Sequence, residues 1–250
     1  MSETVNILGV DVAVTTLEKT AARVDRWLAD GHKAYMCFAP VSTLVDSQKS
    51  AEYRSVVNGA SLINPDGMPV VWVAHWKGEP EMQRTCGPDF LVHMLSRAGA
   101  NGYRHFFYGG TDKSKDILLQ KIKTRWPKVN IAGAIAPPFR AVGEIEDQSV
   151  IDEINASGAD ILWVGLGSPK QDYWMANHRD RLTVPVICGV GAAFDFVAGI
   201  KPMAPEWMRR SGLEWFFRLC SEPRRLWRRY ILGNTQFIYY LITKELFRHG

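Results

Sequence analysis

One aspartate stands beside a glycine where an apolar segment that predicts a strand gives way to a helical pattern. The stretch NPDGMP, Asn64 to Pro69, places Asp66 and its neighbour Gly67 on the connecting turn. A carboxylate that a cleft removes partly from water could take a proton from a substrate as a general base. An isolated Asp-Gly pair is more often only a turn, so the residues alone leave both interpretations open.

A second turn that contains glycines, VGLGSPKQD from Val164 to Asp172, follows another apolar strand and opens a helix. Gly165 and Gly167 allow a tight turn, and Lys170 beside a helix N-terminus offers positive charge to a phosphate. The spacing fits neither the P-loop nor the dinucleotide fingerprint, because Lys170 stands where the third glycine should be. The segment therefore supports phosphate binding and a plain strand-to-helix turn about equally.

A third candidate segment, GVGAAFDFVAG from Gly189 to Gly199, places Asp195 after a strand exit. Asp195 could cap the next helix or hydrogen-bond a sugar or a base, and the sequence leaves both roles open. The sequence has no DxD motif and no Cys/His spacing suited to zinc, so no metal is implied. A bound diphosphate would then have to be neutralised by arginines and helix N-termini. The four separated cysteines are expected to be buried thiols: Cys37, Cys86, Cys188 and Cys220.

The C-terminal fifty residues are strongly basic, with ten Lys/Arg against four Glu from Lys201 to Gly250 and hence a net charge of +6. The whole chain carries only +4, so this end predicts contact with an anionic partner. Within residues 212–231, GLEWFFRLCSEPRRLWRRYI, basic and aromatic residues recur at helical intervals. The members of this set are Trp215, Arg218, Arg224, Arg225, Trp227, Arg228 and Arg229.

Several interpretations of this basic tail remain open at this point. Interleaved cations and aromatic residues are typical of helices that lie on an anionic membrane surface. The same arginines could instead hold a diphosphate, or simply pair with Glu214 and Glu222. Nucleic-acid binding is less favoured, because no helix-turn-helix, zinc or RNA-binding motif accompanies the tail.

Apolar strand-like runs alternate with amphipathic stretches, which predicts an α/β fold with a mostly parallel sheet flanked by helices. Strands are expected to begin the stretches 33–45, 60–76, 104–110, 128–139, 161–171 and 183–196, and helices to occupy 16–31, 88–102, 114–127 and 147–160. Ligands bind beyond the carboxyl ends of such strands. Unusual residues gather there: Asp66-Gly67, Gly109-Gly110, Pro137 to Phe139, Gly165 to Gln171 and Gly189 to Asp195.

The composition predicts a catalytic domain over residues 1–200 and a basic, aromatic-rich helical appendage over 201–250. The N-terminus lacks the pattern of a signal peptide, and no apolar run approaches the roughly 18 residues of a spanning helix. We therefore expect a soluble or peripheral protein. Truncation near residue 200 is expected to give a more soluble protein with poor membrane binding and little activity.

Eight motifs in order carry a resemblance to a known family. They are DGMP at Asp66, RTCGPDF at Arg84, FFYGG, VGLGSPKQ, GVGAAFDFVAG, APEWM, GLEWFFRL and EPRRLWRRY. Over roughly residues 5–240 the chain resembles the WecG/TagA/CpsF glycosyltransferases, glycosyltransferase family 26. The resemblance implies a Rossmann-like fold of the GT-E type.

The resemblance also implies an inverting, metal-independent enzyme without a cofactor, which moves a hexose-type sugar from a UDP-sugar to a polyprenyl-diphosphate-linked sugar. Such enzymes act in surface or exopolysaccharide assembly, at the cytoplasmic face of the inner membrane. Asp66 matches the family's general base, Arg84 a site arginine and Gln171 the glutamine of a PKQE turn. The appendage matches a membrane-associating segment whose arginines complete the site. The donor sugar and the oligomeric state, a homo-oligomer included, stay open.

The residues expected to bind the substrates are Gly67, Arg84, Gly109, Gly110, Gly165, Gly167, Lys170, Gln171 and Asp195. Three segments depart from the family pattern. Phe38-Ala39-Pro40 replaces a Thr-x-Asn that supports the aspartate, so Ser42 or Thr43 is expected to substitute for it. Met203-Ala204-Pro205 replaces Arg-Ala-Pro, and APPF at residues 136–139 is closer to the exopolysaccharide branch. A nucleotide-dependent oxidoreductase and a non-catalytic membrane module are the alternatives.

Overall fold

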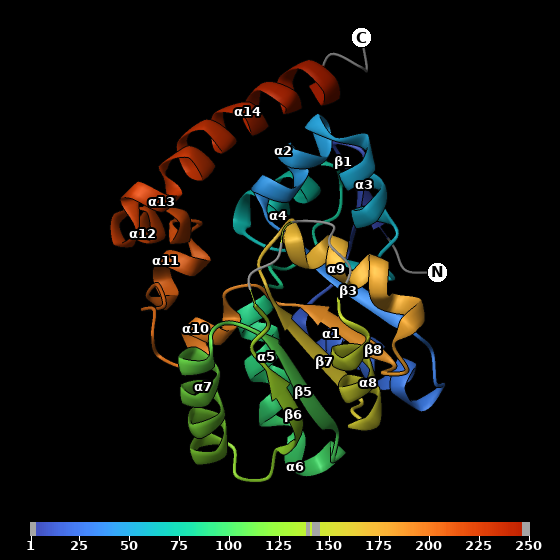
Figure 1. Cartoon of the computed structure of the whole chain (residues 1–250). Coiled ribbons are helices and arrows are strands. Elements are labelled where there is room, and N and C mark those ends of the chain that lie inside the picture. Colours follow the sequence, from blue (N-terminus) through green and yellow to red (C-terminus); the bar gives the residue numbers. More distant parts are fainter. Residues whose placement is uncertain (1–3, 139–140, 142–145, 247–250) are drawn as a thin grey trace.

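The computed structural model describes residues 4–138, 141 and 146–246, and its centre is a six-stranded parallel sheet (Figure 1). The strand order is β4-β3-β8-β7-β5-β6, and every neighbouring pair runs parallel. The strands are β3 (Ala34–Ala39), β4 (Leu62–Pro65), β5 (Arg104–Gly109), β6 (Asn130–Ile135), β7 (Ile161–Gly165) and β8 (Val186–Gly189). All six lie in the stretches predicted to begin with strands, so the Rossmann-like α/β fold is confirmed. Phe139 of the proline-rich strand exit lies outside the described residues.

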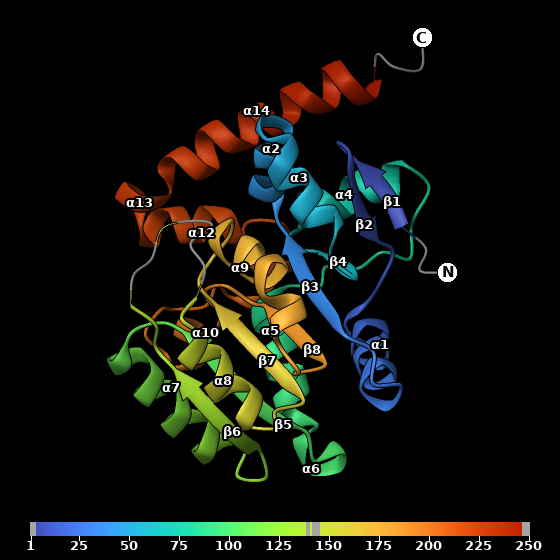
Figure 2. The ribbon, with the colours of Figure 1, turned by 45° about the vertical axis from the view of Figure 1, so that its right-hand side comes forward.

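Helices cover both faces of this sheet (Figures 1 and 2). One face carries α1 (Leu17–Ala29), α5 (Gly87–Ser96), α7 (Asp112–Arg125) and α10 (Ala193–Val197). The other carries α8 (Gln148–Ala156) and α9 (Lys170–His178), which precedes the short 3-10 turn η1 (Arg179–Arg181). A further short helix, α6 (Ala98–Asn101), follows α5. The four stretches predicted to be helical contain α1, α5, α7 and α8, as expected.

Side chains of each strand alternate between these two helical layers, as the geometry of a strand requires. In β3, Met36 and Phe38 pack in the core with α1 and α5, whereas Tyr35 and Cys37 pack in the core with α9. Both sets are apolar, so the strand shows no polar alternation in its sequence. This is the signature of a parallel strand covered on both faces.

A small antiparallel hairpin was not predicted from the sequence. Its strands are β1 (Thr4–Ile7) and β2 (Val10–Ala13), and they are joined at Leu8 and Gly9, which both have positive φ. The hairpin packs in its own apolar cluster with α2 (Val41–Lys49), α3 (Ala51–Asn58) and α4 (Met68–Trp76). This cluster extends the core beyond edge strand β4.

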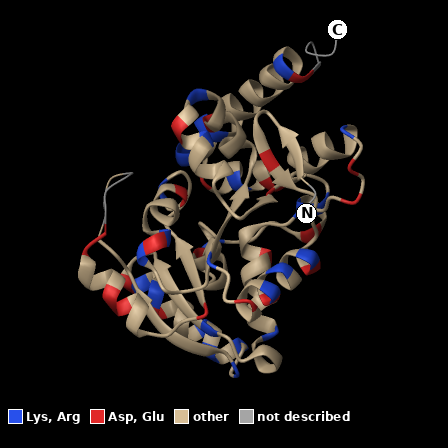
Figure 3. Cartoon of the chain, turned by 90° about the vertical axis from the view of Figure 1, so that its right-hand side faces the viewer, with Lys and Arg blue, Asp and Glu red and all other residues tan. Residues whose placement is uncertain are grey.

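The C-terminal segment is helical and curves over the carboxyl end of the sheet (Figures 1 and 2). It comprises α11 (Glu206–Arg210), α12 (Glu214–Ser221), α13 (Pro223–Trp227), a π-helical turn η2 (Arg228–Leu232), α14 (Gly233–Tyr240) and a second π-helical turn η3 (Leu241–Leu246). Phe237 anchors it, because its side chain is buried in the cluster of α2 and α4. Lys and Arg gather on these helices (Figure 3). Within the described residues, no helix has the length and apolar character needed to cross a membrane.

The cysteines follow the expectation in three of four cases. Cys37, Cys86 and Cys188 are buried free thiols, and burial raises the pKa of each. Cys220 was predicted to be buried but is exposed. It lies on α12, whose described residues include no buried one, because this helix packs over the edge of the molecule rather than within the core.

Candidate active site

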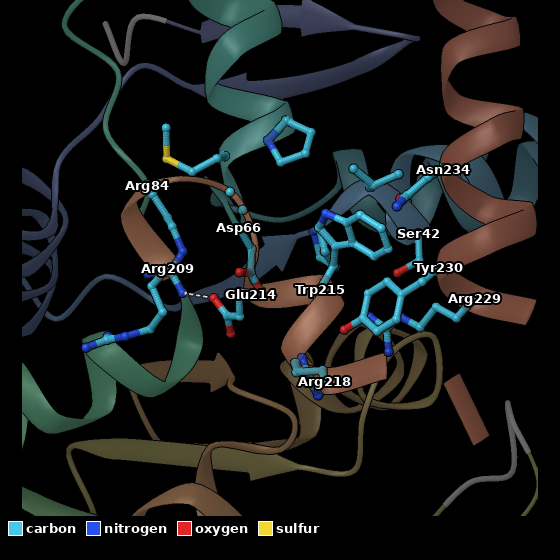
Figure 4. Close-up of a pocket in the computed structure, with 16 residues that line it drawn as sticks. Ser42, Asp66, Arg84, Arg209, Glu214, Trp215, Arg218, Arg229, Tyr230 and Asn234 are labelled. Carbon is cyan, nitrogen blue, oxygen red and sulfur yellow. Dashed lines mark hydrogen bonds and ion pairs between the residues drawn. The ribbon is translucent and has the colours of Figure 1, made fainter. Parts of the chain in front are cut away.

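A pocket lies where the carboxyl ends of β3 and β4 meet the C-terminal helices (Figure 4). It is lined by Pro40, Val41, Ser42, Asp66, Gly67, Met68, Pro69, Arg84, Arg209, Gly212, Glu214, Trp215, Arg218, Arg229, Tyr230 and Asn234. Half of the wall comes from the sheet edge and the other half from residues after 205. The pocket therefore exists only where the two parts of the chain meet.

Asp66 is held at the junction between β4 and the N-terminus of α4. Its backbone N–H donates to the carbonyl of Ala39 at 3.3 Å, so the turn stays attached to the end of β3. Gly67 has φ +106, a conformation that L side chains rarely adopt, and Pro69 lies in the first turn of α4. The glycine and proline thus fix the direction in which the carboxylate enters the pocket.

The electrostatic setting of Asp66 gives it the proton affinity of a useful base. Burial removes water from the carboxylate and raises its pKa from 3.8 to about 6, the largest effect on this group. The Arg84 guanidinium lowers the pKa, the Glu214 carboxylate raises it, and Arg218 and Arg229 lower it. At neutral pH the group is mostly ionised, yet it binds a proton far more readily than an exposed aspartate does.

Arg84 is fixed by two carboxylates from different parts of the chain. One terminal nitrogen donates to Asp89 of α5 at 2.7 Å. The other donates to Glu214 of α12 at 2.5 Å (Figure 4). Arg209 of α11 donates to the same Asp89 at 2.9 Å. Although burial alone would raise the pKa of Asp89, Arg84 holds it below its usual value. This network attaches the C-terminal helices to the body beside Asp66.

Only some of the basic and aromatic residues singled out within 212–231 line the pocket. Trp215, Arg218 and Arg229 line it together with Tyr230 (Figure 4). The remaining members, Arg224, Arg225, Trp227 and Arg228, are all exposed and do not line this pocket.

The prediction that tail arginines pair with Glu214 and Glu222 is correct for Glu222 and wrong for Glu214. Glu222 accepts from Nε of Arg225 at 2.8 Å, but Glu214 pairs with Arg84 of the body. Arg228 and Arg229 also line a neighbouring hollow with Asp46 and Lys49 of α2. The arginines of this segment therefore have different roles: Arg225 pairs within the segment, whereas Arg228 and Arg229 face α2.

The glycines at the strand ends allow close approach of backbone segments. Gly109 pairs with Gly165 in the sheet, and a Cβ on Gly109 would lie 2.7 Å from the Gly165 carbonyl. A Cβ on Gly165 would lie 2.5 Å from the Phe194 ring, and one on Gly110 would lie 2.6 Å from the Ser114 hydroxyl. None of these three glycines lines the Asp66 pocket.

Gln171 is buried between two loops. Its side-chain oxygen accepts from the backbone N–H of Gly167 at 3.1 Å and of Gly191 at 2.9 Å, while its nitrogen donates to the Gly189 carbonyl at 2.7 Å. Lys170 begins helix α9 at the same turn. This amide therefore ties the VGLGSPKQ loop to the strand exit after β8.

We predict that Gln171→Ala lowers the free energy of unfolding by about 2 kcal/mol, because it removes three hydrogen bonds that join the two loops, including the one to the buried Gly189 carbonyl. Thermal or denaturant unfolding of the ligand-free protein measures this change. Gln120→Ala, at an exposed position of α7, serves as the matched control and should change stability little. Equal stability of the two variants would contradict the role assigned to the amide.

Asp195 forms an ion pair with Lys201 at 2.8 Å rather than lying in the Asp66 pocket. The two substitutes expected for the missing asparagine are separated: Ser42 lines the pocket, whereas Thr43 is buried.

Sequence reasoning overlooked Asn64, a buried residue of β4 that accepts from Thr20 at 2.9 Å and donates to the Cys37 carbonyl. Its amide fixes β4 two residues before Asp66.

Four polar or charged pocket residues also escaped the sequence analysis as site residues: Arg209, Glu214, Tyr230 and Asn234. Glu214 and Tyr230 lie inside motifs that had already been noticed, so their proximity to the basic positions was the available signal. Among the described residues, no group of three or more His, Cys, Asp or Glu side chains could hold a metal ion. Four guanidinium groups line the pocket, and two of them, those of Arg84 and Arg209, are paired with carboxylates.

Fold and pocket together define a Rossmann-like α/β protein with a desolvated carboxylate beside guanidinium groups, at the edge where such sheets bind ligands. Comparison with protein families matches residues 5–250 to the "Glycosyl transferase WecG/TagA/CpsF family". The chain therefore belongs to this family of glycosyltransferases, and the resemblance read from its motifs is confirmed.

Two curated relatives carry the same name, "N-acetylglucosaminyldiphosphoundecaprenol N-acetyl-beta-D-mannosaminyltransferase". The protein of Bacillus spizizenii (strain ATCC 23059 / NRRL B-14472 / W23) is 33% identical over 185 residues, which are 74% of this chain and 69% of the relative. The protein of Staphylococcus aureus (strain MW2) is 26% identical over 242 residues, 96% of this chain and 92% of the relative. The second match extends through the C-terminal helices.

Proposed function

We propose that this chain is an inverting glycosyltransferase that moves a sugar from a UDP-sugar to a polyprenyl-diphosphate-linked sugar. The observation that carries the proposal is the joint pocket, in which a desolvated carboxylate lies beside arginines from two parts of the chain. The names of the relatives supply the acceptor class, an N-acetylglucosaminyl diphosphate on a polyprenol. The first donor to test is therefore the UDP-sugar that carries N-acetylmannosamine.

In the proposed reaction Asp66 removes the proton of the acceptor hydroxyl as its oxygen attacks the anomeric carbon of the donor. The bond from this carbon to the UDP oxygen breaks, and UDP leaves with the bonding electrons. Arg218 and Arg229 offset the negative charge of the diphosphates, while Arg84 stays paired with Asp89 and Glu214. Since guanidinium groups supply this charge, the proposal includes activity without a divalent metal.

The experiment is a panel of UDP-sugars incubated with a short-chain polyprenyl diphosphate that carries N-acetylglucosamine. Mass spectrometry identifies the transferred sugar, and NMR of the product gives its anomeric configuration. We expect one donor to react, a β-linkage to form from an α-linked donor, and EDTA to leave the rate unchanged. Retained configuration would contradict direct displacement, and loss of activity in EDTA would contradict metal independence.

The rate of transfer should depend on the ionisation of Asp66. With a pKa of about 6, kcat/KM is expected to fall about tenfold per pH unit below pH 6 and to be level above it. The pH profile of the wild-type protein tests this expectation. It is measured between about pH 5 and 8, the range in which folded proteins tend to be most stable. A rate that stays level down to pH 5, as an aspartate with the ordinary pKa of 3.8 would give, would contradict the desolvated base.

The alternatives make different predictions. A nucleotide-dependent oxidoreductase would bind NAD(P)H, but the turn after β7 lacks the dinucleotide glycine pattern. A non-catalytic membrane module would keep its biological role without Asp66. The proposed location is the cytoplasmic face of the inner membrane, with the basic C-terminal helices on anionic lipid. Vesicle sedimentation with and without anionic lipid tests this placement.

A further inference from the structure

An apolar groove lies beside the Asp66 pocket, between α4 and the C-terminal helices. Its volume is about 740 Å³, within the roughly 300–1,000 Å³ of small-ligand sites. Trp72 and Trp76 of α4 contribute one wall, and Ile231, Ile238 and Leu241 contribute the other. Of the residues that the structure describes, no Lys, Arg, His, Asp or Glu lines the groove.

The groove leaves large apolar side chains in contact with water. Trp72, Trp76, Ile231 and Ile238 are 50%, 58%, 52% and 57% exposed. Single exposed apolar residues are ordinary, but a contiguous set that lines one hollow indicates a binding surface. Because its described lining is uncharged and mostly apolar, the groove suits an uncharged, largely apolar group.

The groove is continuous with the pocket that contains the charges. Five residues line both: Val41, Pro69, Trp215, Tyr230 and Asn234. Trp215, Tyr230 and Asn234 lie between Asp66 and the C-terminal helix (Figure 4). A ligand that fills both spaces must therefore be anionic at one end, beside Arg218 and Arg229, and purely apolar at the other.

We propose that the groove holds the pyrophosphate-proximal isoprene units of the acceptor's polyprenyl chain, an inference that rests on the proposed function. The wall from Ile231 to Leu241 extends for about 15 Å at 1.5 Å per helical residue, so it covers several isoprene units. The rest of a longer chain leaves at the Leu241 end. A groove with two walls fits a single chain better than it fits the flat surface of a bilayer.

Binding without turnover tests the groove in the absence of detergent and membrane. Farnesyl diphosphate and inorganic diphosphate are titrated into the full-length protein, and tryptophan fluorescence reports binding. We expect the farnesyl compound to bind at least about tenfold more tightly than inorganic diphosphate. Ile238→Glu should remove this advantage and leave the affinity for inorganic diphosphate unchanged.

The next residue provides the matched control. Tyr239 is 61% exposed on the same helix but does not line the groove, so Tyr239→Glu should keep the farnesyl advantage. Trp76→Gln removes apolar surface from the opposite wall and should reduce the advantage, which keeps the test valid if Ile238→Glu fails to fold. Equal affinities for the two diphosphates in the wild-type protein, or equal effects of the Ile238 and Tyr239 variants, would overturn the proposal. The exposed residues would then belong to a membrane-facing surface.

Turnover separates this inference from the proposed function. Sugar transfer to a farnesyl-linked acceptor is compared with transfer to the methyl-linked analogue. Transfer to both acceptors with equal KM would contradict binding of the isoprene units in the groove, and it would support the proposed transfer reaction. Tighter binding of the farnesyl compound, together with no transfer from any UDP-sugar, would support lipid binding in the groove and contradict the proposed reaction.

Discussion

Asp66→Asn is expected to lower the rate of sugar transfer by about 10²–10⁴-fold, because asparagine cannot accept the proton of the attacking hydroxyl. The amide has nearly the shape of the carboxylate, so the turn at Gly67 and the neighbouring Arg84 network should persist. Donor binding, measured by calorimetry with UDP, should therefore change little. Acceptor-dependent UDP release measures the loss of transfer.

The stability of this variant shows whether its loss of activity reflects unfolding. The folded state raises the pKa of Asp66 from 3.8 to about 6, so the folded protein binds a proton that the unfolded chain releases. The free energy of unfolding should thus fall as pH rises from about 4 to 6. Because asparagine carries no buried charge, Asp66→Asn should be more stable than the wild-type protein at pH 7. Full activity of Asp66→Asn would contradict the assigned role, and a large loss of stability would attribute its inactivity to unfolding instead.

Arg229→Ala and Arg218→Ala are each expected to lower kcat by about 10²–10³-fold, because they remove positive charge from the site where the diphosphate develops negative charge. Both arginines line the pocket, although they belong to the C-terminal helices. A water-soluble, short-chain acceptor is used so that weaker membrane binding does not affect the rate. Lysine at either position should restore part of the activity, since it keeps the charge without the bidentate geometry.

Arg224→Ala is the matched control, since Arg224 is exposed in the same basic segment and does not line the pocket. It should retain the wild-type rate with the soluble acceptor. If Arg224→Ala and Arg229→Ala reduce the rate equally, the arginines act through the net charge of the segment. That result would contradict a specific place for Arg229 in the site.

Much of the fold was predictable because the six parallel strands are short apolar runs whose two faces are both buried. The β1–β2 hairpin escaped prediction because its turn is the Leu8-Gly9 pair rather than an Asn-Gly or Asp-Gly signal. Its position beside α4 depends on contacts between residues far apart in the chain. Local pattern does not encode such packing.

The candidate site divides in the same way. Asp66 and Gly67 could be found locally as candidates, since a strand end followed by an Asp-Gly turn places a carboxylate at the ligand-binding edge, but the choice between a base and a plain turn came from the family resemblance. Arg84 was assigned only through the family resemblance, and its partner Glu214 lies 130 residues further along the chain. Helical spacing predicted a basic helix, but it did not distinguish Arg229 in the pocket from Arg224 in solvent. That distinction depends on how the helix docks, which Phe237 fixes.

The measurement that tests the central claim most directly is UDP release by the full-length protein, with and without the polyprenyl-diphosphate-linked acceptor. We expect release that requires both the acceptor and one particular UDP-sugar, and that nearly disappears in Asp66→Asn and in Arg229→Ala. Release that continues unchanged in both variants would show that transfer occurs elsewhere. That outcome would contradict an active site built jointly by the sheet edge and the C-terminal helices.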